Sequence, residues 1–199
     1  MGSRLRGSAG LDGALARAAG EVPDYPEVGA TRGVLLDGAA LPGGWNHLRL
    51  DRVVGRGDVA FGAAAECVLT WGMHRGTGLG VLAERPRAEL GSTVVVAIGL
   101  GRVRLLAPCR VVWTLDEPDR RGFGYAALPG HPEDGEEAFL VSRDARGAVL
   151  FSVVAFSRPA RRLTRVAGPL VVLGQRLAAR GYARAVRRAG EAAVRPSPA

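Results

Sequence analysis

The sequence contains no lysine. All 27 basic residues are arginine, against 19 acidic residues, which gives a net charge of +8. Dense arginine attracts phosphate, so this charge alone would favour nucleic acid or an anionic membrane as a partner. A chain rich in alanine, glycine and valine and free of lysine is, however, also typical of a GC-rich bacterial genome. The charge is therefore weak evidence for a partner, and no nucleic-acid partner is expected.

Cysteine is scarce as well. Cys67 and Cys109 stand far apart and no CxxC pair occurs, which argues against a disulfide framework and against the common zinc-binding spacings. Both are expected to be free, buried thiols. The sequence has no phosphate-binding loop and no Gly-x-Ser-x-Gly elbow, and the glycines of residues 76–80 lack GxGxxG spacing. We therefore expect no metal site and no cofactor.

Long apolar runs are missing. None reaches the roughly 18 residues that a membrane-spanning helix requires. The first residues lack the continuous apolar segment and the cleavage site of a secretion signal. Arg6 stands where N-myristoylation requires Ser or Thr. These absences predict no transmembrane segment and a cytoplasmic location.

The length and composition predict one domain. A chain of 199 residues with 47% hydrophobic content is long enough for a sizeable core. Residues 1–22, rich in Gly, Ala and Arg, are expected to be a disordered extension, residues 23–189 the domain, and residues 190–199 a disordered tail. No repeat of 20 to 50 residues and no βαβ alternation is present. The oligomeric state is not indicated.

Strand-like segments dominate the middle of the chain. Apolar alternation and β-branched runs predict strands at residues 45–54, 80–83, 92–100, 103–107, 109–115, 122–128, 136–143 and 148–157. Helical spacing occurs at residues 58–71 and near the end of the chain. The run 148–157 is apolar on both faces, which favours a central strand in a sheet covered on both sides. The expected fold class is α+β, with a curved, mainly antiparallel sheet gripping a long C-terminal helix.

The C-terminal helix is predicted to begin at Pro159 and to reach Arg188. Its apolar stripe consists of Leu163, Val166, Leu170, Leu173 and Leu177, and arginines cover most of the remaining surface. Gly168 and Pro169 fall inside this pattern. Because proline removes a backbone hydrogen bond, they predict a kink that would let the two halves of the helix move separately and admit a ligand.

Several motifs, in a fixed order, resemble one known family. They are Tyr25-Pro26-Glu27-Val28-Gly29-Ala30-Thr31, Trp71-x-Met73-His74-Arg75, Cys109-Arg110-Val111-Val112-Trp113, Asp116-Glu117-Pro118, Gly122-Phe123-x-Tyr125-x-x-Leu128-Pro129-Gly130-His131-Pro132-Glu133, Gly135-Glu136-Glu137 and Ala155-Phe156-Ser157-Arg158-Pro159-Ala160. Over residues 24–188 the chain resembles the bacterial and plant family called domain of unknown function 1990. The resemblance implies the START-like helix-grip architecture of polyketide cyclases and lipid-transfer domains. It implies no particular activity.

A pocket between the sheet and the C-terminal helix is the first candidate site. Aromatic residues on successive predicted strands could line such a pocket or simply fill the core. Together with the helix stripe they give the candidate ligand-binding set Trp113, Tyr125, Phe139, Phe156, Arg158, Leu163, Val166, Leu170 and Leu173. Of these, Trp113, Tyr125 and Phe156 are expected to face the helix. Arg158 could bind a carboxylate or phosphate, or pair with Glu136 or Glu137.

The polar candidates centre on one loop. His131, with Glu133, Glu136 and Glu137 after it, could form an acid–base pair or bind a metal. Two prolines and two glycines surround this histidine, so a turn is the favoured interpretation. His74 could face the mouth of the cavity, although the helix dipole alone favours a histidine at a helix C-terminus. No residue is assigned a catalytic role.

Three functions remain open from the sequence. The first is binding of a small apolar or amphipathic molecule, which requires only the cavity. The second is an enzyme of the polyketide cyclase or hydrolase type, which also requires a positioned acid–base pair. The third is an arginine-driven binder of nucleic acid or of a membrane surface. Nucleic-acid binding usually adds exposed aromatic rings, and the predicted helix carries only Tyr182, so the first function is favoured.

Overall fold

The computed structural model describes residues 2–100, 103–160 and 168–195. Seven strands form one antiparallel sheet in the order β1-β7-β6-β5-β4-β3-β2. The elements are α1 (Gly2–Ala18), α2 (Ala30–Leu36), β1 (Asn46–Arg56), α3 (Gly57–Leu69), α4 (Gly72–Gly76), β2 (Gly80–Ala83), β3 (Thr93–Leu100), β4 (Val103–Asp116), β5 (Arg120–Ala127), β6 (Glu133–Arg143), β7 (Ala148–Pro159) and α6 (Gly168–Val194).

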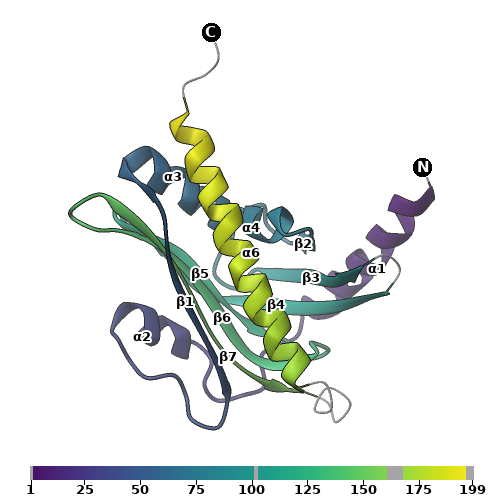
Figure 1. Ribbon diagram of the computed structural model, residues 1–199. Helices are drawn as coiled ribbons and strands as arrows, with labels where there is room; N and C mark the ends of the chain where they lie inside the picture. The colour runs from purple at the N-terminus through teal and green to yellow at the C-terminus, as the bar shows by residue number, and fades with distance from the viewer. Residues whose placement is uncertain (1, 101–102, 161–167, 196–199) are drawn as a thin grey trace.

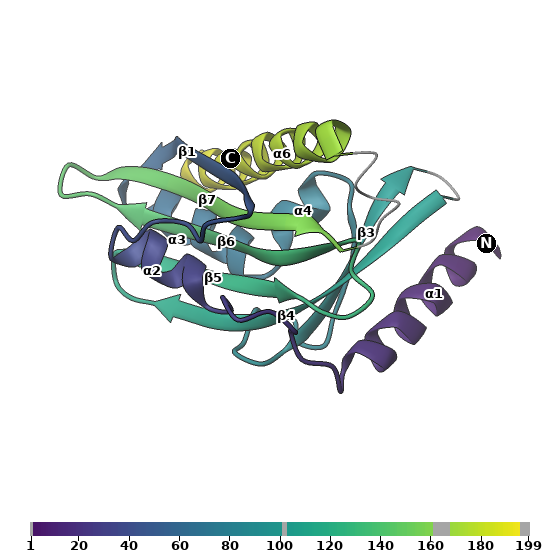
Figure 2. The ribbon, with the colours of Figure 1, turned by 90° about the horizontal axis from the view of Figure 1, so that it is seen from below.

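Helices cover both faces of the curved sheet (Figures 1 and 2). The concave face carries α3, α4 and α6, and the main core lies between these helices and the sheet. The convex face carries α2, over β6 and β7. Residues 149–156 of β7 are buried apart from the half-buried Leu150, so the predicted two-sided burial of this strand is confirmed.

The strand at residues 103–116 is continuous, where the sequence predicts two strands separated at Pro108. Proline lacks a backbone N–H, but Pro108 pairs with Val95 within the β3–β4 ladder and interrupts neither strand. The remaining predicted strands are present, with ends that differ by a few residues.

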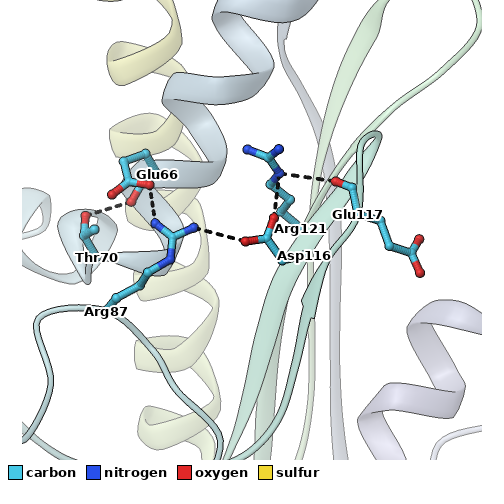
Figure 3. A network of polar contacts seen from close by, with 6 residues as sticks. All are labelled: Glu66, Thr70, Arg87, Asp116, Glu117 and Arg121. Atoms are coloured by element: carbon cyan, nitrogen blue, oxygen red, sulfur yellow. Dashed lines mark hydrogen bonds and ion pairs between the residues drawn. The ribbon is translucent and has the colours of Figure 1, made fainter.

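Helix α3 docks on the concave face through small and apolar residues at helical spacing, among them Phe61, Ala64 and Val68. A chain of charged groups joins its outer side to the end of the sheet (Figure 3). Arg87 bridges Glu66 of α3 to Asp116 at the end of β4, and Asp116 also accepts from Arg121 at 2.9 Å. These groups are largely solvated, so each pair stabilises the fold by less than about 1 kcal/mol.

The C-terminal helix differs from its prediction. Strand β7 continues to Pro159, so the helix does not begin at that residue, and α6 is described from Gly168 onward. Pro169 lies in the first described turn of α6, where proline removes no intrahelical hydrogen bond. The predicted kink also depends on residues 161–167, which lie outside the described residues, and it stays a prediction. The buried stripe consists of Ala179, Tyr182, Ala183, Ala185 and Val186. Leu173 and Leu177 are 52% and 55% exposed and do not face the sheet.

The N-terminal region also differs from its prediction. Residues 2–18 form α1 beside β3 and β4, with Ala14 and Ala18 buried, where a disordered extension is expected. The Arg110 guanidinium donates to the backbone oxygens of Ala18 and Ala19, at 3.2 and 2.7 Å, and so caps the end of this helix. Helix α6 continues to Val194, so residues 190–194 are helical where a disordered tail is expected. The division into extension, domain and tail otherwise stays a prediction.

Candidate functional site

A polar group lies on the concave face, otherwise lined by the apolar core. Tyr125 of β5 and Glu137 of β6 are direct cross-strand partners, so the register of the sheet sets them side by side. The Tyr125 hydroxyl donates to the Glu137 carboxylate at 2.8 Å. Glu137 lies deep beneath the helices and yet is only half-buried, whereas both residues beside it on β6 are buried. Its carboxylate is the natural centre of the site.

His74 approaches this pair from α4. Its Nε2 lies 3.2 Å from the Tyr125 hydroxyl, and rings of Tyr125, Phe139, Tyr182 and Trp71 surround the imidazole at centroid distances of 5.0 to 5.9 Å. The turn that aims it inward begins at Trp71, whose φ of 65° is the one positive value at a described non-glycine residue. Such a backbone conformation costs of order 1 kcal/mol and persists only when the surrounding structure enforces it.

Burial sets the protonation of this group. It lowers the pKa of His74 to about 3, with a further contribution from Arg75, so the imidazole is neutral. Burial raises the pKa of Glu137 to about 7, against the effect of the hydrogen bond from Tyr125. With Tyr125 donating to Glu137, His74 donates from Nε2, and Nδ1 is left as a buried acceptor with no hydrogen-bond partner in the described part of the chain.

A second polar group ties α6 to the sheet. The Gln175 amide donates to the Glu133 carboxylate at 2.8 Å and to the Ser157 hydroxyl at 2.9 Å, and Ser157 donates to the other Glu133 oxygen at 3.3 Å. Burial raises the pKa of Glu133, which these hydrogen bonds partly offset. Glu133 and Glu137 therefore project from the same face of β6, and neither forms an ion pair among the described residues.

Three predicted site residues lie on the opposite face. A β-bulge in β4 between Val111 and Trp113 turns the Trp113 indole to the convex side, where it packs with α2. Phe156 lies on the convex side because it alternates with Ala155, which faces the main core. The expectation that Trp113 and Phe156 face the C-terminal helix is therefore wrong. Glu136, next to Glu137 on the strand, also points to the convex side.

Arg158 lies outside the concave site. Its guanidinium stacks on the Trp45 ring at 4.2 Å and pairs with Asp134 at 3.3 Å. Neither Glu136 nor Glu137 is its partner, because both are committed to hydrogen bonds elsewhere.

His131 shapes the loop before β6. Its Nδ1 accepts from the Glu133 backbone N–H at 2.9 Å, and burial lowers its pKa to about 4. The side chain is half-buried and belongs to a turn rather than to a group of ligands. In the described ranges, no three His, Cys, Asp or Glu side chains gather as a metal site would require.

Tyr125, Phe139, Glu133, Glu137 and His74 are the predicted residues that the structure brings together. Leu163 and Val166 lie outside the described residues, as does the side chain of Leu170, and Leu173 is exposed. Sequence reasoning misses Ser157, Gln175 and Tyr182. Gln175 precedes the buried Ala179 by one helical turn and therefore lies on the same face of α6. A helix stripe drawn through the alanines would have included it.

A curved antiparallel sheet gripping a long C-terminal helix defines the helix-grip fold of START-like proteins, as predicted from the sequence. A hypothetical protein from Helicobacter pylori shares it with a TM-score of 0.56 and 9% identity, over 84% of this chain and 95% of that one. The protein Ara h 8.0201 shares it with a TM-score of 0.52 and 9% identity, over 75% of this chain and 99% of that one. At such low identity these likenesses show the fold alone.

The chain belongs to the family described as domain of unknown function (DUF1990), whose family model matches residues 24–185. A UPF0548 protein from Deinococcus radiodurans is 39% identical over 186 residues, which are 88% of this chain and 91% of the relative. The family resemblance found in the sequence is thereby confirmed. No helix in the described part of the chain is long and apolar enough to cross a membrane.

Proposed function

We propose that this protein binds a small apolar or amphipathic molecule between the concave face of the sheet and α6. The observation that carries the proposal is the environment of Glu137. Its carboxyl group lies deep on an apolar face with a pKa raised to about 7 and with Tyr125 as its one hydrogen-bond partner among the described residues. A polar group that is removed from water and short of hydrogen-bond partners is typical of a ligand-binding site, where the ligand supplies the missing hydrogen bond.

The proposed ligand has an apolar body and a polar end. Phe139, Phe123 and Tyr182 pack against one another and give the cluster apolar surroundings. No arginine side chain in the described ranges pairs with Glu137. A donor on the ligand, such as a hydroxyl or an amine, would satisfy Glu137. Alternatively, a hydroxyl donating to His74 Nδ1 would satisfy the buried acceptor.

Native mass spectrometry of protein purified from its own host tests this function. The expected result is an added small-molecule mass that disappears on denaturation. In the variant Glu137→Gln the affinity for this molecule should fall at least about tenfold, because a lost hydrogen bond to a charged group is worth roughly 1.5 to 3 kcal/mol. The control is Asp134→Asn, the same acid-to-amide change on the same strand but on the other face, and it should retain the ligand.

A second candidate function is an enzyme that uses the same cluster. It is favoured by one observation: a carboxyl group with a pKa of about 7 is joined through Tyr125 to a neutral histidine, an arrangement suited to proton transfer near neutral pH. If it holds, the recovered molecule should be converted on incubation at neutral pH. Glu137→Gln should abolish that conversion while Asp134→Asn preserves it.

A further inference from the structure

The outward face of α6 is chemically distinct from the rest of the surface. Opposite the buried stripe, it presents two exposed leucines followed by arginines, all at helical spacing. We call this set the outer stripe: Leu173, Arg176, Leu177, Arg180, Arg184, Arg187 and Arg188. The helix has five arginines and one acidic residue, Glu191, so five minus one gives it a net charge of +4.

Most arginines of the outer stripe form no ion pair with a described residue. Away from α6, Arg87, Arg121 and Arg143 each hold a carboxylate. Within the described residues of the stripe, only Arg187 does so, through Glu191 at 3.6 Å. Unpaired guanidinium groups on one straight helix attract an extended anionic surface.

Grooves on both sides of α6 place apolar surface between these arginines. One groove, of about 390 Å³, runs past Leu79, Leu177, Arg184 and Arg188. The other, of about 300 Å³, runs past Leu50, Val53, Arg180 and Arg187. Arg184 forms the ridge between the two grooves and lines both of them. Each groove thus combines aliphatic side chains with cationic groups, the two chemistries that a phospholipid presents together.

We propose that the outer stripe docks α6 on a membrane surface rich in anionic phospholipid. The arginines would meet the phosphates, while Leu173 and Leu177 would enter the boundary between head groups and acyl chains. Nucleic acid fits less well because single strands usually stack on exposed aromatic rings, and Tyr182, the aromatic residue of α6, is only 4% exposed. This surface lies on the opposite side of α6 from the proposed ligand site, and the two proposals stand separately.

Vesicle flotation at physiological salt tests the proposal. Vesicles of phosphatidylcholine alone are compared with vesicles in which one lipid in three is phosphatidylglycerol. The full chain should bind the second kind and scarcely the first. The double variant Arg180→Gln/Arg184→Gln should bind the anionic vesicles roughly 25-fold more weakly, at about fivefold for each arginine near the surface.

Two matched variants distinguish binding through the outer stripe from binding through the net positive charge of the protein. Arg17→Gln/Arg32→Gln removes the same charge from exposed positions on α1 and α2, away from α6, and should bind like the parent. Leu173→Gln/Leu177→Gln keeps every charge and should lose the binding that survives raised salt, because the leucines supply the part that salt does not screen. Circular dichroism should show that all of these variants fold, since each altered side chain is exposed.

Three results would overturn the proposal. The first is equal binding to neutral and anionic vesicles, including binding to neither. The second is an equal loss of binding in the Arg17/Arg32 control, which would show only the effect of net charge. The third is duplex DNA that displaces the chain from anionic vesicles and binds it with an affinity that survives added salt, which would identify a nucleic-acid surface instead.

Discussion

Two neighbouring residues on β6 define the chemistry of this molecule. Glu136 faces the convex side and is well satisfied: it accepts from the backbone N–H groups of Gly29 and Thr31 at 2.6 and 3.0 Å and from the Thr31 hydroxyl. Glu137 faces the concave side and accepts from Tyr125. The same residue type therefore serves as a structural anchor on one face and as a candidate binding group on the other.

The raised pKa of Glu137 predicts how stability depends on pH. Below about pH 4.5 the group is protonated in both the unfolded and the folded state, and burial costs little. Between about pH 4.5 and 7 the unfolded state releases this proton while the folded state retains it, so stability falls as the pH rises and levels off above about pH 7. Glu137→Gln lacks this titration, so it should gain about 3 kcal/mol relative to the parent over this range.

Urea unfolding of the parent and of Glu137→Gln, across pH 4 to 8 in about five steps, measures this difference. Other titrating groups are common to both proteins and cancel. A difference that stays constant with pH would contradict the elevated pKa.

His131 is expected to have a structural role. His131→Ala should keep the fold and cost about 1 kcal/mol at neutral pH, because one side-chain-to-backbone hydrogen bond is lost. The pKa of His131 is lowered to about 4 from 6.5, so the neutral ring stabilises the parent above pH 6.5 and does so less as the pH falls towards 4. The cost of the substitution should shrink over that range. Loss of a co-purified ligand or of a bound metal in His131→Ala would contradict this role.

At the scale of elements, α2 depends on Glu136. This seven-residue helix is too short to be stable alone, and Glu136 binds the backbone where it begins. Glu136→Gln should therefore destabilise the protein by about 2 to 3 kcal/mol, since an amide N–H₂ would then face the backbone donors. Chemical denaturation measures the loss, and amide hydrogen exchange should accelerate in α2 first. Glu136→Gln should therefore lower the free energy of unfolding, whereas Glu137→Gln should raise it. A Glu136→Gln variant as stable as the parent would show that Glu136 does not anchor α2.

The start of α6 makes a second prediction at this scale. Pro169 lies in the first turn, where the fixed φ of proline suits the helix. Pro169→Ala should change the free energy of unfolding by less than about 1 kcal/mol and leave the exchange rate of a neutral apolar fluorescent probe unchanged. Stabilisation near 3 kcal/mol, with slower exchange of the probe, would indicate a proline inside the helix and would support the predicted kink.

At the scale of the whole molecule, periodicity in the sequence predicts the sheet well because the core imposes it. The alternation of Phe123 and Tyr125, or of Val153 and Ala155, follows directly from burial on the concave face. The face of Trp113 could not be predicted, because one bulge residue shifts it and nothing local marks the bulge. The Tyr125–Glu137 pair depends on the register between two strands, which the pattern of either strand alone does not give.

The helices were harder to predict than the sheet. The apolar stripe expected from Leu163 to Leu177 has helical spacing, yet β7 extends past Ser157 and the buried face of α6 is made of alanines with Tyr182 and Val186. Small residues allow close approach of helices, as where Gly76 of α4 meets Ala185. Hydrophobicity patterns give leucine more weight than alanine, so they assigned the buried face of α6 to the side that carries the exposed Leu173 and Leu177.

The central claim is that the concave face under α6 binds an amphipathic small molecule. Nuclear magnetic resonance of the labelled protein, titrated with dodecanol, dodecanoate and dodecylamine in turn, locates binding most directly. The claim predicts that at least one of these probes shifts the signals of Tyr125, Glu137, Phe139 and Tyr182, while Val34 of α2 and Trp113 beneath it stay unchanged. Shifts confined to the convex face or to the outer stripe, or no saturable shift with any of the three probes, would contradict it.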